Sequence, residues 1–219
     1  MFSNSVDRGR TVLVVDLRSG PPWPAALTAG GVGRHRGRRI RHAFDAQNHG
    51  CHVPPLDLPC GGPCPGPSSG VPGLGGSWGA CDPRNKKNRR RRSSISVETK
   101  NARLLVDTPV DMREQCLEAG INSIDAVLYT HSHADHTHGI DDLRGFNFSA
   151  EGSIDIYGSP ETLADIRQRF GYAFAPVEGK GPWYRPSLTA HAITSPFRVG
   201  DIKIVPFKQV HGRSTTLGY

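Results

Sequence analysis

The chain has 219 residues, enough for one domain or for one domain with a tail. Its 27 Lys and Arg residues exceed its 20 Asp and Glu residues, and hydrophobic residues make up only 36% of the chain. No apolar run approaches the roughly 20 residues of a membrane-spanning helix, and residues 1–10 lack the apolar core of a secretory signal. Five irregularly spaced cysteines without a C-x-x-C pair exclude a disulfide framework and a cysteine-built zinc ribbon. These features favour a cytoplasmic protein without a membrane partner.

Residues 1–65 are predicted to be a low-complexity, disordered tail. Gly and Pro account for 18 of residues 1–66, which also carry eight Arg, no Lys and four acidic residues. Such a composition buries too little apolar surface to offset the entropy of ordering it. The only strand-like run there is residues 11–17. A basic arm for nucleic acid and a shifted reading frame upstream of a domain are the alternative interpretations.

From residue 66 to residue 219 the pattern is typical of an α/β domain. Alternating residues predict a hairpin, and shorter apolar runs predict three further strands. The predicted strands are residues 93–98, 102–107, 124–129, 154–157 and 202–207. Strands that alternate with helices favour the α/β class.

Two helices are predicted between these strands. The first has an N-cap at Thr108 and a stop at Gly120, and the second covers residues 160–170. The apolar stripe predicted for the first helix consists of Val110, Met112, Cys116 and Leu117.

The segment with the clearest chemistry directly follows the strand predicted at 124–129. His131, His133, Asp135 and His136 fall within six consecutive positions of the run T-H-S-H-A-D-H-T-H. Imidazole and carboxylate groups suit Zn²⁺, Mn²⁺ or Fe, and a turn brings such residues around one point. A single histidine is more often a solvated or core residue, but this grouping predicts a metal site.

The order His131-x-His133-x-Asp135-His136 resembles the signature of the metallo-β-lactamase superfamily, whose fold is an αββα sandwich with a dinuclear metal site. Asp107 resembles the family's first motif, an aspartate that supports the histidine loop. His211 resembles its third motif. Three further runs are similar to the branch that contains phosphoribosyl cyclic phosphate phosphodiesterase: residues 68–72, 88–94 and 139–144. The resemblance covers about residues 66–219.

The resemblance implies roles for individual residues. His131, His133 and His211 would hold one of two divalent metal ions, Zn or Mn, and Asp135 and His136 would help to hold the second. Asp135 is also the implied catalytic residue, as the hydrogen-bond partner of a metal-bound hydroxide that attacks phosphorus.

Two residues beside the signature are candidates for substrate binding. For His138 the alternative is a supporting or solvent-facing role, and for Arg144 it is a place on the surface.

The implied function is a metal-dependent phosphodiesterase for a small cyclic phosphate. The basic run 86–92 favours the alternative of an RNA- or DNA-processing phosphodiesterase, with nucleic acid as partner. A thiolester or lactone hydrolase would share the histidine loop equally well.

The sequence also departs from the family's pattern. The family has a bridging aspartate after the third motif and a further histidine near the end of the domain, but this chain stops at Tyr219. The apolar first strand before Ser68 is missing. We therefore expect an incomplete αββα sandwich that lacks the first strand and much of the second half. Only part of the ligand set is expected. An inactive fragment is therefore the alternative expectation, unless a partner, such as a second copy in a homodimer, supplies the rest.

Overall fold

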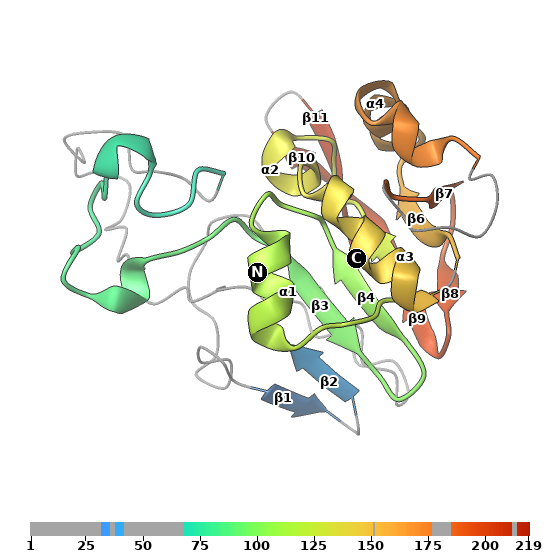
Figure 1. Cartoon of the computed structure of the whole chain (residues 1–219), viewed down its shortest axis with the longest axis horizontal. Coiled ribbons are helices and arrows are strands. Elements are labelled where there is room, and N and C mark those ends of the chain that lie inside the picture. Colours follow the sequence, from blue (N-terminus) through green and yellow to red (C-terminus); the bar gives the residue numbers. More distant parts are fainter. Residues whose placement is uncertain (1–31, 36–37, 42–67, 151, 177–184, 212–213) are drawn as a thin grey trace.

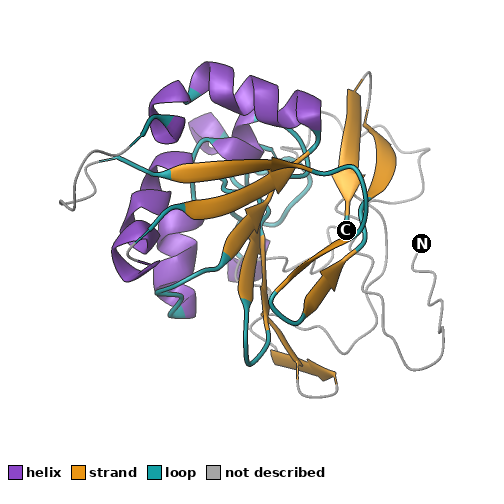
Figure 2. Cartoon of the chain, turned by 90° about the vertical axis from the view of Figure 1, so that its right-hand side faces the viewer, coloured by secondary structure: helices purple, strands orange, loops and turns teal. Residues whose placement is uncertain are grey.

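The computed structural model describes residues 32–35, 38–41, 68–150, 152–176, 185–211 and 214–219. In these ranges a seven-stranded sheet carries a layer of helices on one face and short two-stranded hairpins on the other (Figures 1 and 2). No helix in the described ranges is long and apolar enough to cross a membrane.

The large sheet is mixed, and its strands follow one another in chain order. They are β1 (Val32–His35), β2 (Arg38–Arg41), β3 (Ile95–Glu98), β4 (Arg103–Val106), β5 (Ala126–Leu128), β6 (Ile154–Gly158) and β7 (Leu188–Ala192). Strands β1 to β4 pair antiparallel, and β4 to β7 pair parallel. Val106 at the end of β4 lies opposite Leu128 at the end of β5, so the loops that follow these strands meet at one edge of the sheet.

The helices and the remaining strands form the outer layers. The helices are α1 (Met112–Ala119), α2 (Ala134–Thr137), α3 (Arg144–Ala150) and α4 (Pro160–Arg169), with 3-10 turns at Leu74–Gly76, Lys86–Asn88, Ile140–Leu143 and Gly171–Phe174. The antiparallel hairpins are β8 (Phe197–Val199) with β9 (Ile202–Ile204), and β10 (Phe207–His211) with β11 (Ser214–Gly218).

The sheet separates two apolar cores. Leu105 and Val127 pack among the helices, whereas Leu104 and Leu128 pack with Ile204 of the β8–β9 hairpin. Side chains alternate between the faces of a strand, and both faces are covered here. This explains why β5, and β4 after its first residue Arg103, are short apolar runs.

The first helix differs from its prediction. It begins at Met112, with Asp111 as the N-terminal flanking residue, and Thr108 is not its cap. Thr108 is instead fully buried, and its hydroxyl lies 2.9 Å from the Tyr129 hydroxyl. Of the predicted stripe, Met112 and Cys116 are buried, but Val110 and Leu117 are exposed. The predicted stop is confirmed, because Gly120 has a left-handed φ of 65°.

The predicted strand 202–207 is divided into two. Strand β9 ends at Ile204 and β10 begins at Phe207, with Pro206 between them. Proline has no backbone N–H to donate to a ladder, which is consistent with a break there.

Strands β1 and β2 lie inside the predicted tail, and β2 pairs with β3. The disorder predicted for residues 1–65 stays a prediction, and the strand-like run 11–17 lies outside the described residues. The domain boundary at residue 66 stays a prediction.

Arginines of the basic run make specific contacts in the protein. Arg90 donates to the Cys81 sulfur at 3.2 Å, Arg91 pairs with Glu118, and Arg92 pairs with Asp111 at 3.2 Å.

Candidate metal centre

The candidate site includes a carboxylate, Asp107, which directly follows β4 and is fully buried. Its Oδ1 accepts the Thr130 backbone N–H at 2.8 Å, and its Oδ2 accepts the Thr130 hydroxyl at 2.8 Å and Nδ1 of His136 at 2.7 Å. Asp107 has a positive φ of 63°, a strained conformation for a residue with a side chain. The carboxylate thus joins the end of β4 to the histidine loop, and its predicted supporting role stays a prediction.

A close backbone contact holds the same two loops together. The Thr108 N–H donates to the His136 carbonyl, and the Gly139 N–H donates to the Thr108 carbonyl, both at 2.8 Å. A Cβ at position 139 would lie 2.1 Å from the Pro109 carbonyl oxygen, so only glycine fits.

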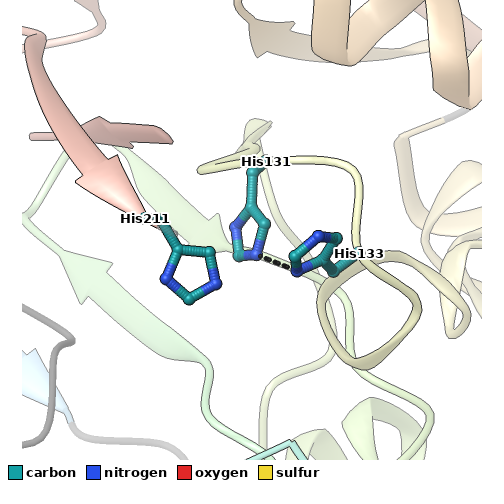
Figure 3. Close-up of side chains that lie close together, drawn as sticks. All are labelled: His131, His133 and His211. Atoms are coloured by element: carbon teal, nitrogen blue, oxygen red, sulfur yellow. Dashed lines mark hydrogen bonds between the residues drawn. The ribbon is translucent and has the colours of Figure 1, made fainter. Parts of the chain in front are cut away.

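Three imidazoles converge beside the Asp107 carboxylate (Figure 3). The ligand atoms of His131, His133 and His211 all lie within 4.8 Å of one another. Nε2 of His131 is 3.0 Å from Nδ1 of His133, and the ring of His211 lies 5.1 Å and 5.4 Å from these two rings between centroids. His131 is buried, and the other two histidines are exposed. The structure therefore brings together the three histidines predicted to share one metal.

Hydrogen bonds select the ring nitrogen that His131 presents. The Thr130 hydroxyl donates its one proton to Asp107, so it accepts from Nδ1 of His131 at 2.9 Å. This leaves Nε2 of His131 unprotonated and facing the group. Burial, and then the charge of His136, lower the pKa of His131 to about 4, so the ring is neutral at pH 7. A neutral imidazole is the form that binds a metal, and this donor set fits a divalent ion.

Asp135 and His136 form a second pair next to the group. Nε2 of His136 lies 3.3 Å from Oδ2 of Asp135, and its ring is 4.2 Å from that of His131 between centroids. Burial lowers the pKa of His136, but the charge and hydrogen bond of Asp107 outweigh it and raise the pKa to about 10. Burial likewise raises the pKa of Asp135, but the hydrogen bond from His136 outweighs it and holds that pKa below its usual value. In the metal-free protein His136 is thus a cation between two carboxylates.

The last hairpin delivers His211 to the site. His211 ends β10, and the next strand, β11, is fastened to the histidine loop. The Leu217 N–H donates to the Thr130 carbonyl at 2.9 Å, and the Tyr219 hydroxyl donates to the Tyr129 carbonyl at 2.7 Å. These two hydrogen bonds join β11 to the two residues that directly precede His131.

The two candidates for substrate binding lie outside the histidine group. His138 is exposed, with its ring 5.6 Å from that of Phe170 between centroids. Arg144 is exposed and pairs with Asp141 at 3.1 Å. Their predicted roles are not tested by these contacts.

Sequence reasoning missed Thr130, which links Asp107 to His131. A hydroxyl residue directly before a histidine cluster was the available signal. It also missed the contacts of Leu217 and Tyr219, because no motif marks a hydrogen bond from a distant part of the chain.

Residues 102–219, more than half of the chain, match the family model described as the Beta-lactamase superfamily domain. The chain belongs to the beta-lactamase superfamily. The matched range of this superfamily member contains every residue of the candidate metal centre, from Asp107 to His211. The predicted fold family and α/β class are thereby confirmed.

Two solved structures are similar to this chain. A diphosphatase from the PhnP family is 30% identical, with a TM-score of 0.59, and the match covers 69% of this chain and 57% of that one. The metallo-beta-lactamase fold protein YhfI from Bacillus subtilis is 21% identical, with a TM-score of 0.43, over 57% of this chain and 47% of that one.

One curated protein is similar to this chain but is named for another activity than the diphosphatase. It is an octanoyltransferase from Porphyromonas gingivalis (strain ATCC BAA-308 / W83), which is 37% identical over 158 residues, or 70% of this chain. The chain spans only 31% of the length of that relative.

Proposed function

We propose that this superfamily member is a metal-dependent phosphodiesterase that acts on a small cyclic phosphate. The observation that carries the proposal is the convergence of His131, His133 and His211 within 4.8 Å. The similarity to the diphosphatase of the PhnP family, at 30% identity and a TM-score of 0.59, favours a phosphate-containing substrate over the other substrates of this fold.

The residues divide into two ligand sets. His131, His133 and His211 would hold one divalent ion, and Asp135 and His136 would contribute to a second. When bound, such ions neutralise charge on a phosphodiester and lower the pKa of water toward neutrality.

The chain's own residues supply orientation. Asp107 accepts Nδ1–H of His136 at 2.7 Å, which leaves Nε2 of that ring to point at Asp135. Through the Thr130 hydroxyl, Asp107 also fixes Nε2 of His131 as the free nitrogen. The buried carboxylate of Asp107 thereby orients both imidazole rings. Asp135 would accept the proton of the attacking water.

Nucleic acid is a less favoured substrate. Arg90, Arg91 and Arg92 contact Cys81, Glu118 and Asp111, so three of the six basic side chains of the run already have partners in the protein. Acyl thiolester hydrolysis is the second candidate, because the P. gingivalis relative is named as an octanoyltransferase.

The first experiment measures metal content per chain and hydrolysis of bis(p-nitrophenyl) phosphate and of a ribose cyclic phosphate. His131→Ala and His133→Ala are expected to lose bound metal and turnover. His191→Ala is the matched control, because this half-exposed histidine pairs with Asp155 at 2.9 Å, outside the group.

The outcomes separate the candidates. Metal with phosphodiester turnover supports the proposal. Metal with hydrolysis of an octanoyl thiolester and none of either phosphodiester favours the second candidate. Equal metal content in wild type and both variants would show that the three histidines are not the ligands.

A further inference from the structure

Helix α4 contacts the one residue that separates the first two histidines. The Ser132 hydroxyl donates to Oδ2 of Asp165 at 2.6 Å, and the Arg169 guanidinium donates to the Ser132 carbonyl oxygen. Asp165 and Arg169 lie one helical turn apart, and their side chains approach to 3.8 Å. The hydroxyl and the carbonyl oxygen of Ser132 are therefore both hydrogen-bonded to side chains of the same helix.

The two histidines beside Ser132 differ in their own support. His131 is buried, and its Nδ1 is held by Thr130 at 2.9 Å. His133 is exposed, and the ring contacts described for it are with His131 and His211. Its ring therefore depends on its backbone for orientation.

The carbonyl of Ser132 belongs to the peptide plane that leads into His133. That plane is rigid, so fixing its oxygen fixes the positions of the His133 nitrogen and Cα, from which the imidazole is carried. The hydrogen bond from Arg169 acts directly on this plane, and Asp165 holds the hydroxyl of the same residue. Both contacts hold Ser132 and thereby the backbone from which the exposed ligand, His133, extends.

Helix α4 is a firm support for this purpose. Its N-terminus is capped by the Ser159 hydroxyl, which accepts the Thr162 N–H at 3.1 Å. Leu163 and Ile166 anchor its inner face in the helix-side core. Groups on such an element place a ligand more firmly than groups on a loop do.

We propose that Asp165 and Arg169 are positioning residues that hold His133 in its metal-binding orientation through Ser132. The inference rests on the proposed metal-dependent function and adds to it two residues that touch no ligand atom. It assigns to α4 the task of keeping the exposed member of the three-histidine group in place.

The test is the affinity of the full chain for Zn²⁺, measured by competition with a chromophoric chelator at fixed pH. Arg169→Met and Asp165→Ala are each expected to weaken binding about tenfold, the lower end of the range for groups that support metal ligands, because both side chains are partly exposed. Arg169→Lys, which still donates to a carbonyl, is expected to restore most of the affinity.

Arg167→Met is the matched control. Arg167 lies in the same last turn of α4, and its guanidinium sits 5.2 Å from the ring centroid of Phe174 rather than at Ser132. Arg167→Met removes the same charge from the helix as Arg169→Met does, but it is expected to leave the Zn²⁺ affinity unchanged. The visible absorption spectrum of Co²⁺ bound to each variant gives a second readout, which should change for Arg169→Met and not for Arg167→Met.

The results distinguish this inference from the proposed function. A wild type that binds no Zn²⁺ would overturn both. A wild type that binds Zn²⁺, with unchanged affinity in Arg169→Met and Asp165→Ala, would overturn only the positioning role. Equal weakening by Arg167→Met would also overturn it, because the effect would then belong to the helix as a whole.

Discussion

Replacing Asp107 with alanine is expected to destabilise the metal-free protein by about 3–5 kcal/mol. The carboxylate is fully buried and accepts three hydrogen bonds, two from Thr130 and one from His136, at 2.7–2.8 Å. Alanine would leave all three donors without their acceptor and would remove the partner of a charged imidazole.

The magnitude follows from these contacts. A buried donor that loses its acceptor costs about 1–3 kcal/mol, so three donors at the lower end cost about 3 kcal/mol. Alanine also tolerates the left-handed backbone at φ 63° less well than aspartate, which adds about 1 kcal/mol. For a domain of this size each kcal/mol shifts Tm by about 2–4 °C, so Tm should fall by roughly 6–20 °C.

The assay is thermal and urea unfolding of Asp107→Ala beside Asp155→Ala. Asp155 also pairs with a histidine, His191, at 2.9 Å, but both side chains are more than 40% exposed. Such an exposed pair contributes at most about 1 kcal/mol. Equal losses of unfolding free energy in the two variants would refute the argument that burial, rather than pairing with a histidine, makes the contribution of Asp107 large.

Three further predictions concern the histidines and one glycine. Zinc binding at pH 7 should release about one proton from His136, whose pKa of about 10 keeps it charged without metal; calorimetry in two buffers measures this, and no net release would contradict it. The pKa of His131 is about 4 in the folded state and 6.5 in the unfolded state, so between these pH values the unfolded state binds a proton that the folded state does not. The Tm of the metal-free wild type should therefore fall more than that of His131→Gln when the pH is lowered from 6.5 to 4. Parallel curves of Tm against pH would argue against this. Gly139→Ala should lower the free energy of unfolding by about 3 kcal/mol, because the new Cβ would lie 2.1 Å from the Pro109 carbonyl oxygen. The control is Gly145→Ala in α3, where nothing lies within 4 Å of the new Cβ and the change should be neutral or slightly stabilising. Urea unfolding measures both.

The central sheet was predictable because its strands carry strong local patterns. Strands β3 to β6 and helix α4 lie close to their predicted ranges, since apolar runs and a proline-led helix start need little tertiary context. Strands β7, β8 and β11 were missed. Strand β7 reads L-T-A-H-A, an alternation whose apolar positions are mostly small alanines, and β11 reads S-T-T-L-G, which is neither an apolar run nor an alternation. Their conformation is decided by pairing with β6 and β10.

The candidate site was predictable where one short segment holds the ligands. The spacing of His131, His133, Asp135 and His136 is local information, and the resemblance added Asp107 and His211. The start of α1 was mispredicted at Thr108, because its hydroxyl contacts Tyr129 rather than capping a helix. A competing tertiary partner of that kind is invisible in a linear pattern.

The fastening of β11 to the histidine loop links metal binding to the folding of the chain. His211 comes 80 positions after His131, so an ion shared by the three imidazoles would close a long loop across the protein. Closing such a loop carries a chain-entropy cost that rises only slowly with its length. At a hundredfold excess over its dissociation constant, a ligand specific to the folded state adds about 2.7 kcal/mol of stability. The free metal concentration would then set how often the last hairpin separates from the sheet, and the ion would act as a reversible crosslink of the fold.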